Sequence, residues 1–163
     1  MASVIKDGVT RILFVCLGNI CRSPLAEGLM REHVAARGLS DAFEIDSAGT
    51  GSWHVGEAPD RRMRQTARSH GVDLDHLRGR QITSDDLRRF DHVIVMDHEN
   101  LANVRSLDRA GRFTDRVRLL RDYDPTPGDG AVPDPYYEGG FEGVYAIVDR
   151  STRALLDALT GAR

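Results

Sequence analysis

The stretch from Cys16 to Ser23 places a cysteine, a glycine, an arginine and a serine directly after a short apolar run. The run Arg11–Cys16 is typical of a buried β-strand. Ser23-Pro24 is typical of a helix start, with serine as the N-cap and proline as the first helical residue. We therefore predict a closed loop between the carboxyl end of a strand and the amino end of a helix.

The chemistry of this loop suits a phosphoryl group. Five residues separate Cys16 from Arg22, enough to wrap one loop around a tetrahedral anion, and a helix amino end favours negative charge. In such surroundings the pKa of a thiol falls from about 8.5 to roughly 3.5–7.5, so we expect Cys16 to react as a thiolate. The Arg22 fork matches two phosphoryl oxygens and the charge that develops on them. The alternative, a buried structural cysteine beside a surface arginine, is common for isolated residues.

Apolar runs alternate with helical patterns along the whole chain, which indicates an α/β fold. Strands are predicted over Arg11–Cys16, Phe43–Asp46, His92–Met96 and Val117–Leu120. Helices are predicted over Pro24–Arg37, Pro59–His70, Thr83–Arg89, Glu99–Arg109 and Phe141–Leu159, the third opened by a capping box of Thr83 and Asp86. This alternation favours a parallel sheet with right-handed crossovers and a site at the carboxyl ends of its strands.

Composition limits the class of protein. A chain of 163 residues predicts one compact domain. The formal net charge is −3, with Lys6 as the only lysine, which argues against a nucleic-acid partner. The densest basic cluster, Arg61-Arg62-Met63-Arg64, is interpreted as a solvated helix face. No apolar stretch approaches the roughly 20 residues of a membrane helix, and two cysteines give no disulfide framework. We therefore expect a soluble, cytoplasmic protein without membrane contact; export without a signal and the oligomeric state stay open.

Four motifs resemble those of the low-molecular-weight protein tyrosine phosphatases, in the family's order and spacing over nearly the whole chain. They are Val15 to Pro24, Ser47-Ala48-Gly49-Thr50, Val95-Met96-Asp97 and Asp134-Pro135-Tyr136-Tyr137. The resemblance implies one domain over residues 1–163, with 1–9 as a flexible extension. It implies a four-stranded parallel sheet with helices on both faces and the phosphate-binding loop between the first strand and the first helix.

The same resemblance implies hydrolysis of phosphotyrosine through a phosphocysteine intermediate, without a cofactor. Cys16 would be the nucleophile, Arg22 the phosphate clamp, and Asp134 the general acid and then the base. From the residues alone, Asp122, Asp124 and Asp129 compete with Asp134 for this role. The residues expected around the phosphate are Leu17, Gly18, Asn19, Ile20 and Cys21.

Supporting roles are expected for four further side chains, and additional roles for Asn19 and Cys21. We expect Ser23 to donate a hydrogen bond to the Cys16 sulfur, and Asn19 to adopt a left-handed conformation. By resemblance, Ser47 and His76 hold the Asn19 amide. Asp97 either orients the loop or Arg22, or caps the next helix. Cys21, by resemblance, protects Cys16 through a reversible disulfide.

Specificity is expected from aromatic walls, because the loop itself recognises only phosphate. Trp53, Tyr136 and Tyr137 would sandwich a phenyl ring and favour phosphotyrosine in proteins, such as a bacterial tyrosine kinase or host proteins. A protein arginine phosphatase is one alternative, although the relatives with that activity carry threonine where this chain has Ile20. A non-catalytic phosphate-binding module is another. An arsenate reductase would need cysteines after Cys21, and no residue spacing suggests a metal site.

Overall fold

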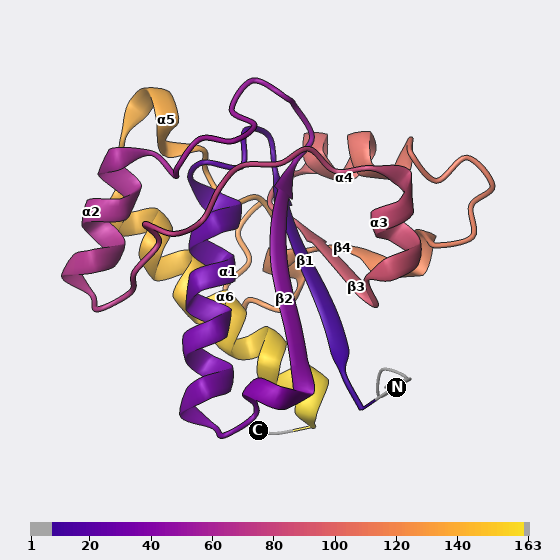
Figure 1. Cartoon of the computed structure of the whole chain (residues 1–163), viewed down its shortest axis with the longest axis horizontal. Helices are drawn as coiled ribbons and strands as arrows, with labels where there is room; N and C mark the ends of the chain where they lie inside the picture. Colours follow the sequence, from indigo (N-terminus) through magenta and orange to yellow (C-terminus); the bar gives the residue numbers. More distant parts are fainter. Residues whose placement is uncertain (1–7, 162–163) are drawn as a thin grey trace.

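The computed structural model describes residues 8–161, so residues 1–7 of the expected extension over residues 1–9 lie outside the described range. Its sheet consists of β1 (Thr10–Cys16), β2 (Phe43–Gly49), β3 (His92–Val95) and β4 (Val117–Leu119). These strands pair in parallel in the order β2-β1-β3-β4 (Figure 1). The predicted four-stranded parallel sheet is confirmed.

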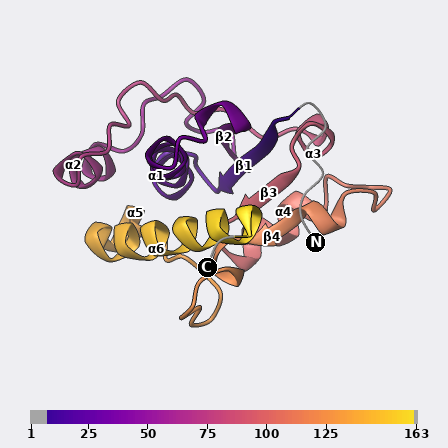
Figure 2. The ribbon, with the colours of Figure 1, turned by 90° about the horizontal axis from the view of Figure 1, so that it is seen from below.

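Helices cover both faces of this sheet, as predicted (Figure 2). They are α1 (Arg22–Ala36), α2 (Arg61–Ser69), α3 (Ser84–Arg89), α4 (His98–Arg105), α5 (Pro135–Glu138) and α6 (Phe141–Thr160). Single 3₁₀ turns lie at Ser40–Ala42, Thr114–Arg116 and Leu120–Asp122. Helices α1 and α6 pack together on one face, α3 and α4 lie on the other, and α2 contacts α6.

Strand β1 explains why two helical layers form. The side chains of residues 12–15 are fully buried and alternate between two hydrophobic cores, as the period of two in a strand requires. Ile12 and Phe14 pack into the core shared with α1 and α6, whereas Leu13 and Val15 pack into the core shared with α3 and α4. An apolar run of this kind is typical of a parallel strand that is covered on both faces.

Strand β2 is longer than predicted. We expected it to end at Asp46 and a loop to begin at Ser47, but Ser47–Gly49 continue the strand and pair with residues 14–16 of β1. The parallel partner β1 extends to Cys16, so its backbone groups hold this segment in the sheet. The second motif therefore lies beside Cys16, along the same sheet edge.

Two predicted helix starts have different outcomes. Helix α1 begins at Arg22 with Cys21 as its N-cap and no side-chain cap, so the prediction that Ser23 is the N-cap is wrong. The Ser23 hydroxyl is used by neighbouring side chains instead. At α3 the predicted capping box is confirmed, since Thr83 and Asp86 form both of its hydrogen bonds.

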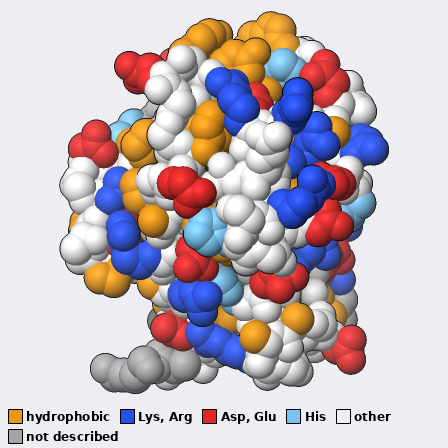
Figure 3. All heavy atoms as spheres, turned by 90° about the vertical axis from the view of Figure 1, so that its left-hand side faces the viewer, with side chains coloured by type: hydrophobic (Ala, Val, Ile, Leu, Met, Phe, Trp, Pro, Cys, Tyr) orange, Lys and Arg blue, Asp and Glu red, His pale blue; other side chains and the backbone are white. Residues whose placement is uncertain are grey.

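The sheet order sets the position of the site. Strand β1 lies between β2 and β3, so the strand order reverses there. Ligands of open α/β sheets bind beyond the carboxyl ends of the strands at the point where the order reverses. On the side that α2 occupies, basic and acidic side chains are interspersed, and hydrophobic ones gather at the end that carries α5 (Figure 3). Within residues 8–161, no helix has both the length and the apolar character needed to cross a bilayer.

Candidate active site

The loop between β1 and α1 is held from outside through its carbonyl groups. Cys16 O accepts a hydrogen bond from Thr50 N at 2.9 Å, Leu17 O accepts one from Gly51 N at 2.9 Å, and Ile20 O accepts one from Asp60 N at 2.8 Å. These carbonyls therefore point towards the surrounding chain. The segments that follow β2 and precede α2 form the outer support of the loop.

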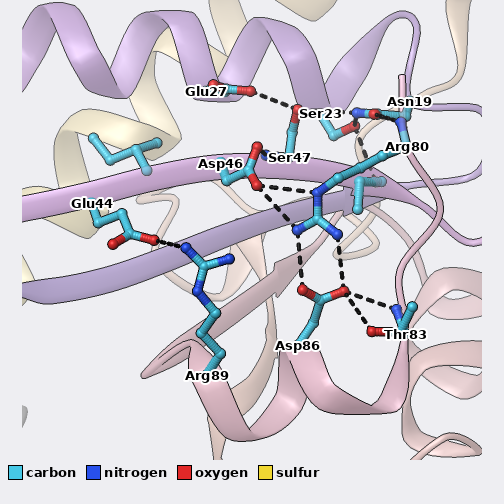
Figure 4. A network of polar contacts seen from close by, with 12 residues as sticks. Asn19, Ser23, Glu27, Glu44, Asp46, Ser47, Arg80, Thr83, Asp86 and Arg89 are labelled. Atoms are coloured by element: carbon cyan, nitrogen blue, oxygen red, sulfur yellow. Dashed lines mark hydrogen bonds and ion pairs between the residues drawn. The ribbon is translucent and has the colours of Figure 1, made fainter. Parts of the chain in front are cut away.

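Asn19 has the left-handed conformation that we predicted, with φ of 56°. It is the only residue other than glycine with positive φ among residues 8–161, and asparagine tolerates this region better than most residues. Its Nδ2 donates to Ser23 Oγ at 2.8 Å and to Ser47 Oγ at 3.0 Å. Asn19 thus joins the loop to both α1 and β2 (Figure 4).

Ser23 contacts the Cys16 side chain directly. Its Oγ lies 3.0 Å from Cys16 Sγ, and both side chains are buried. Ser23 Oγ accepts a hydrogen bond from Asn19, and Ala48 O lies 3.5 Å away as a second acceptor for its proton. Either atom of the shorter Cys16–Ser23 contact could be the donor, so the geometry permits the hydrogen bond from Ser23 to the sulfur that we expected.

Glu27 is a member of this network that the sequence analysis missed. The side chain is buried in α1, and Glu27 Oε1 accepts from Ser47 Oγ at 2.7 Å (Figure 4). Arg31 pairs with the same carboxylate at 2.8 Å. Burial raises the pKa of Glu27, while the hydrogen bonds from Ser47 and Arg31 oppose that shift. The spacing of Glu27 and Arg31, four residues apart on one helix, was the only signal in the sequence.

His76 does not hold the Asn19 amide, which corrects our expectation from the resemblance. Its side chain is exposed, and among the described residues no hydrogen bond joins it to Asn19. The amide oxygen of Asn19 accepts instead from the backbone N–H of Arg80 at 3.0 Å. The Arg80 guanidinium in turn binds Asp46 and Asp86, each at 3.1 Å, linking β2 to α3 (Figure 4).

Arg22 is almost completely buried, with 3% of its side chain exposed. Its Nη1 donates to Asp97 Oδ2 at 2.7 Å and to Val132 O at 3.0 Å, and its Nη2 lies 3.5 Å from Asp134 Oδ2. Burial by itself would lower the pKa of the guanidinium, but Cys16, Asp97 and Asp134 together raise it above its usual value. The group is thus a fixed cation at the base of the loop.

Asp97 fulfils both of the alternatives that the sequence left open. One oxygen binds Arg22, and the other accepts from Asn100 N at 2.8 Å as the N-cap of α4. The cap fixes the carboxylate at the end of β3, because helix N-terminal N–H groups need acceptors. Asp97 therefore orients Arg22 from a position that the helix itself holds.

Asp134 directly precedes α5, and its Oδ2 lies 3.5 Å from Arg22 Nη2. It is the N-cap of α5, accepting from Tyr136 N at 3.1 Å, and 38% of its side chain is exposed. The competing carboxylates have other partners. Asp124 is fully buried, and hydrogen bonds from Arg150 first, with Arg121, hold its pKa far below the usual range. Asp122 and Asp129 accept from nearby backbone N–H groups.

A cavity of about 350 Å³ brings the expected catalytic and wall residues together. Its lining consists of Cys16, Leu17, Gly18, Ile20, Cys21, Arg22, Trp53, His54, Asp134, Tyr136 and Tyr137. Of the four candidate aspartates, Asp134 is the one in this lining. His54 was not anticipated, because an isolated histidine after a tryptophan gives no pattern. Its Nδ1 lies 2.9 Å from Glu57 Oε1.

The aromatic residues form the outer walls of the cavity. Trp53 is 70% exposed and Tyr137 87%. The Tyr136 and Tyr137 rings meet edge to face with centroids 4.8 Å apart, and the Arg62 guanidinium lies 5.7 Å from the Tyr136 centroid. Exposed aromatic faces next to a buried cation suit a ligand with an aromatic body and a charged end.

Cys21 is buried and free, as is Cys16. Burial first, and the Asp60 carboxylate next, raise the pKa of the Cys21 thiol well above its usual range. Cys21 therefore stays a neutral thiol beside Cys16. Among residues 8–161, no group of three or more His, Cys, Asp or Glu side chains is placed to hold a metal ion.

Comparisons with known proteins agree with this geometry. The family model "Low molecular weight phosphotyrosine protein phosphatase" matches residues 11–163. A low molecular weight protein-tyrosine-phosphatase of Streptomyces coelicolor is 45% identical over 153 residues, covering 91% of this chain and 93% of the relative. The crystal structure of YfkJ from Bacillus subtilis superposes with a TM-score of 0.90 at 38% identity, covering 94% of this chain and 96% of that one. A Drosophila arginine phosphatase has a TM-score of 0.83 at 36% identity, covering 90% and 96%.

Fold, sequence and cavity together define an enzyme of the protein-tyrosine-phosphatase class, a phosphoric monoester hydrolase. Within that class, the chain belongs to the low molecular weight phosphotyrosine protein phosphatase family.

Proposed function

We propose that this protein hydrolyses phosphotyrosine in proteins through a phosphocysteine intermediate. The observation that carries the proposal is the single cavity lined by Cys16, Arg22 and Asp134 together with Trp53 and Tyr136. It combines a nucleophile, an anion clamp, a proton donor and aromatic walls within reach of one phosphorylated ring. The cytoplasm suits this chemistry, since a reducing compartment keeps the catalytic thiol free.

In the first step the Cys16 thiolate attacks phosphorus in line with the aryl oxygen. The S–P bond forms as the P–O bond to tyrosine breaks, and Asp134 gives its proton to the departing phenolate oxygen. Arg22 and the loop N–H groups bind the equatorial oxygens, on which charge develops. Asp97 keeps the Arg22 fork oriented through the 2.7 Å ion pair.

In the second step water hydrolyses the phosphocysteine. The Asp134 carboxylate takes a proton from the attacking water, a new O–P bond forms, and the S–P bond breaks to release phosphate and the thiolate. Ser23 Oγ, 3.0 Å from the sulfur, stabilises the thiolate as it leaves. No step calls for a metal or an organic cofactor, so we expect full activity in a chelator.

Replacement of Cys16 provides the test. Cys16→Ser should abolish turnover, at least about 10⁴-fold, because the hydroxyl is a far weaker nucleophile than a thiolate. Rapid acid quenching of the wild type with ³²P-labelled phosphotyrosine peptide should trap phosphate on Cys16, located by mass spectrometry. Measurable turnover by Cys16→Ser, or the absence of trapped cysteinyl phosphate, would contradict the mechanism.

A protein arginine phosphatase is the second candidate function, favoured by the likeness to the Drosophila arginine phosphatase. Ile20 lines the cavity where relatives with that activity carry threonine, and an apolar side chain there offers no partner to a guanidinium. We therefore expect kcat/KM for phosphotyrosine peptides to exceed that for matched phosphoarginine and phosphoserine peptides by at least about 10²-fold. Comparable rates for phosphoarginine would transfer the proposal to that substrate.

A further inference from the structure

A second cavity, of about 300 Å³, adjoins the catalytic one. The two share Leu17 and Trp53 as a common wall. The remaining lining comes from the two residues after β2, from Gln81 and Ile82 before α3, and from the last turn of α4 with the two residues after it. We call it the flanking cavity. It lies at the same carboxyl edge of the sheet as the nucleophile loop, where β2 continues past Ser47.

The lining of the flanking cavity carries no charged side chain. Leu17, Trp53, Ile82 and Leu107 are apolar, and the other lining residues are glycine or neutral polar residues. This is unusual in a chain with 25 acidic and 22 basic residues among 163. Transfer of an apolar side chain from water into this cavity is favourable, whereas a carboxylate or an ammonium group would lose its hydration without gaining a charged partner.

Trp53 lines both cavities and lies between them. Its indole lies against Gly51, where an added Cβ would come within 1.9 Å of the ring, so only glycine permits this position. The ring is nevertheless 70% exposed. An exposed indole between two hollows is a typical anchor for a bound polypeptide, since tryptophan contributes much contact area at low cost in conformational entropy.

We infer that the flanking cavity receives an uncharged, apolar side chain of the substrate polypeptide, close in sequence to the phosphorylated tyrosine. The inference rests on the proposed function. The phosphorylated ring occupies the catalytic cavity, the chain passes over Trp53, and a nearby residue such as leucine descends beside Leu107. Binding there discriminates among phosphoproteins, because the phosphate loop contacts the same group in all of them.

A peptide scan tests this inference. Phosphotyrosine peptides with alanine at every flanking position are compared with peptides that carry one leucine, glutamate or lysine at each nearby position. We expect leucine at one or two positions to raise kcat/KM about 5- to 10-fold over alanine, with no gain from glutamate or lysine there. p-Nitrophenyl phosphate, which has no flanking residues, serves as the reference substrate.

Asn103→Trp supplies the matched variant. Asn103 is exposed on α4 and lines the flanking cavity but not the catalytic one, so an indole there should fill the cavity without touching the hydrophobic core. The leucine preference should disappear, while kcat/KM for p-nitrophenyl phosphate stays within about twofold of wild type. Ala102→Trp adds the same group at an exposed position of α4 outside the lining and should keep the preference.

The outcomes separate the two proposals. If p-nitrophenyl phosphate and the phosphotyrosine peptides are hydrolysed but no position favours leucine, the inference is overturned and the proposed function stands. A preference that survives Asn103→Trp overturns it equally. If no phosphotyrosine substrate is hydrolysed at all, the proposed function fails, and this inference fails with it.

Discussion

The two sides of the catalytic cavity differ in burial and in hydrogen bonding. The side that carries the proposed nucleophile, called the nucleophile side, is buried and closed by hydrogen bonds: Cys16 and Arg22 are each 2% exposed, and Asn19 is bonded to two neighbouring serines. The side that carries the proposed general acid, called the acid side, is open, with 38% of the Asp134 side chain and 87% of Tyr137 exposed. Groups that stabilise charge are most effective when fixed in place. A group that exchanges protons with water and meets varied leaving groups needs access to solvent.

Removal of the acid has the largest effect that this contrast predicts. Asp134→Asn keeps the size and the α5 cap acceptor but cannot donate a carboxylic proton. We expect kcat for phosphotyrosine to fall about 10²- to 10⁴-fold, with less loss for p-nitrophenyl phosphate because its phenolate leaves more easily. Stability should change little, since Asp134 lies in the open part of the cavity.

Asp129→Asn is the control for the acid. It changes an acidic side chain of the same loop that binds backbone outside the cavity, and we expect kcat within about twofold of wild type. Equal loss in the two variants would show that loop charge matters and not proton donation. In that case the contrast between a fixed nucleophile side and an open acid side would have no catalytic meaning.

The sequence predicts some features of the fold and the site but not others. Local patterns predicted β1, the loop after it, the left-handed Asn19 and the Thr83 capping box, because each depends on residues adjacent in the chain. Tertiary pairing decided the rest. Strand β2 runs to Gly49 because β1 lies beside it. The partner of the Asn19 amide depends on the path of the chain before α3, which no local pattern specifies.

Glu27 is a similar case. Nothing in its immediate neighbours marks it as buried, and an acidic residue on a helix is ordinarily solvent-exposed. Its burial becomes intelligible only when β2 delivers the Ser47 hydroxyl to it. The polar network behind Cys16 thus joins residues of α1, β2 and the loop, and its contacts through Ser47 and Glu27 could be proposed only by resemblance or from the structure.

Lowering the pH should destabilise the packing of α1 against α6. His33, on α1, is buried against Thr152 and lies 3.4 Å from Asp149; burial first, and Arg153 next, lower its pKa from 6.5 to about 4. The unfolded chain therefore takes up the proton first as pH falls. The contribution of neutral His33 to the free energy of unfolding is complete above about pH 6.5. It is lost between pH 6.5 and 4, by up to about 3 kcal/mol.

Urea unfolding at several pH values measures this loss. His33→Gln should flatten the dependence between pH 6.5 and 4, because glutamine can donate to Thr152 but does not titrate. His76→Gln, at an exposed position, is the control and should leave the slope unchanged. An identical slope in wild type and His33→Gln would show that other groups govern the acid sensitivity of the α1 and α6 layer.

The polar network on the nucleophile side should show its value in both stability and rate. Ser47→Ala removes the donor to buried Glu27 and one acceptor of Asn19, so we expect a loss of about 1–3 kcal/mol in the free energy of unfolding. The rate should also fall, because Asn19 then orients Ser23 less firmly. Ser69→Ala, at an exposed serine, should change stability by less than about 0.5 kcal/mol.

A substitution in the exposed aromatic wall should have the smallest effect on the kinetic constants. It tests the open acid side of the cavity. Tyr137→Ala removes an aromatic face that contacts Tyr136 but supports no core. We expect KM for phosphotyrosine to rise about two- to fivefold with kcat nearly unchanged, since the ring binds substrate and transition state alike. Val55→Ala, another exposed apolar residue outside the cavity lining, should leave both constants unchanged. If Tyr137→Ala lowered kcat as strongly as Asp134→Asn, the acid side would depend on fixed packing as much as the nucleophile side does.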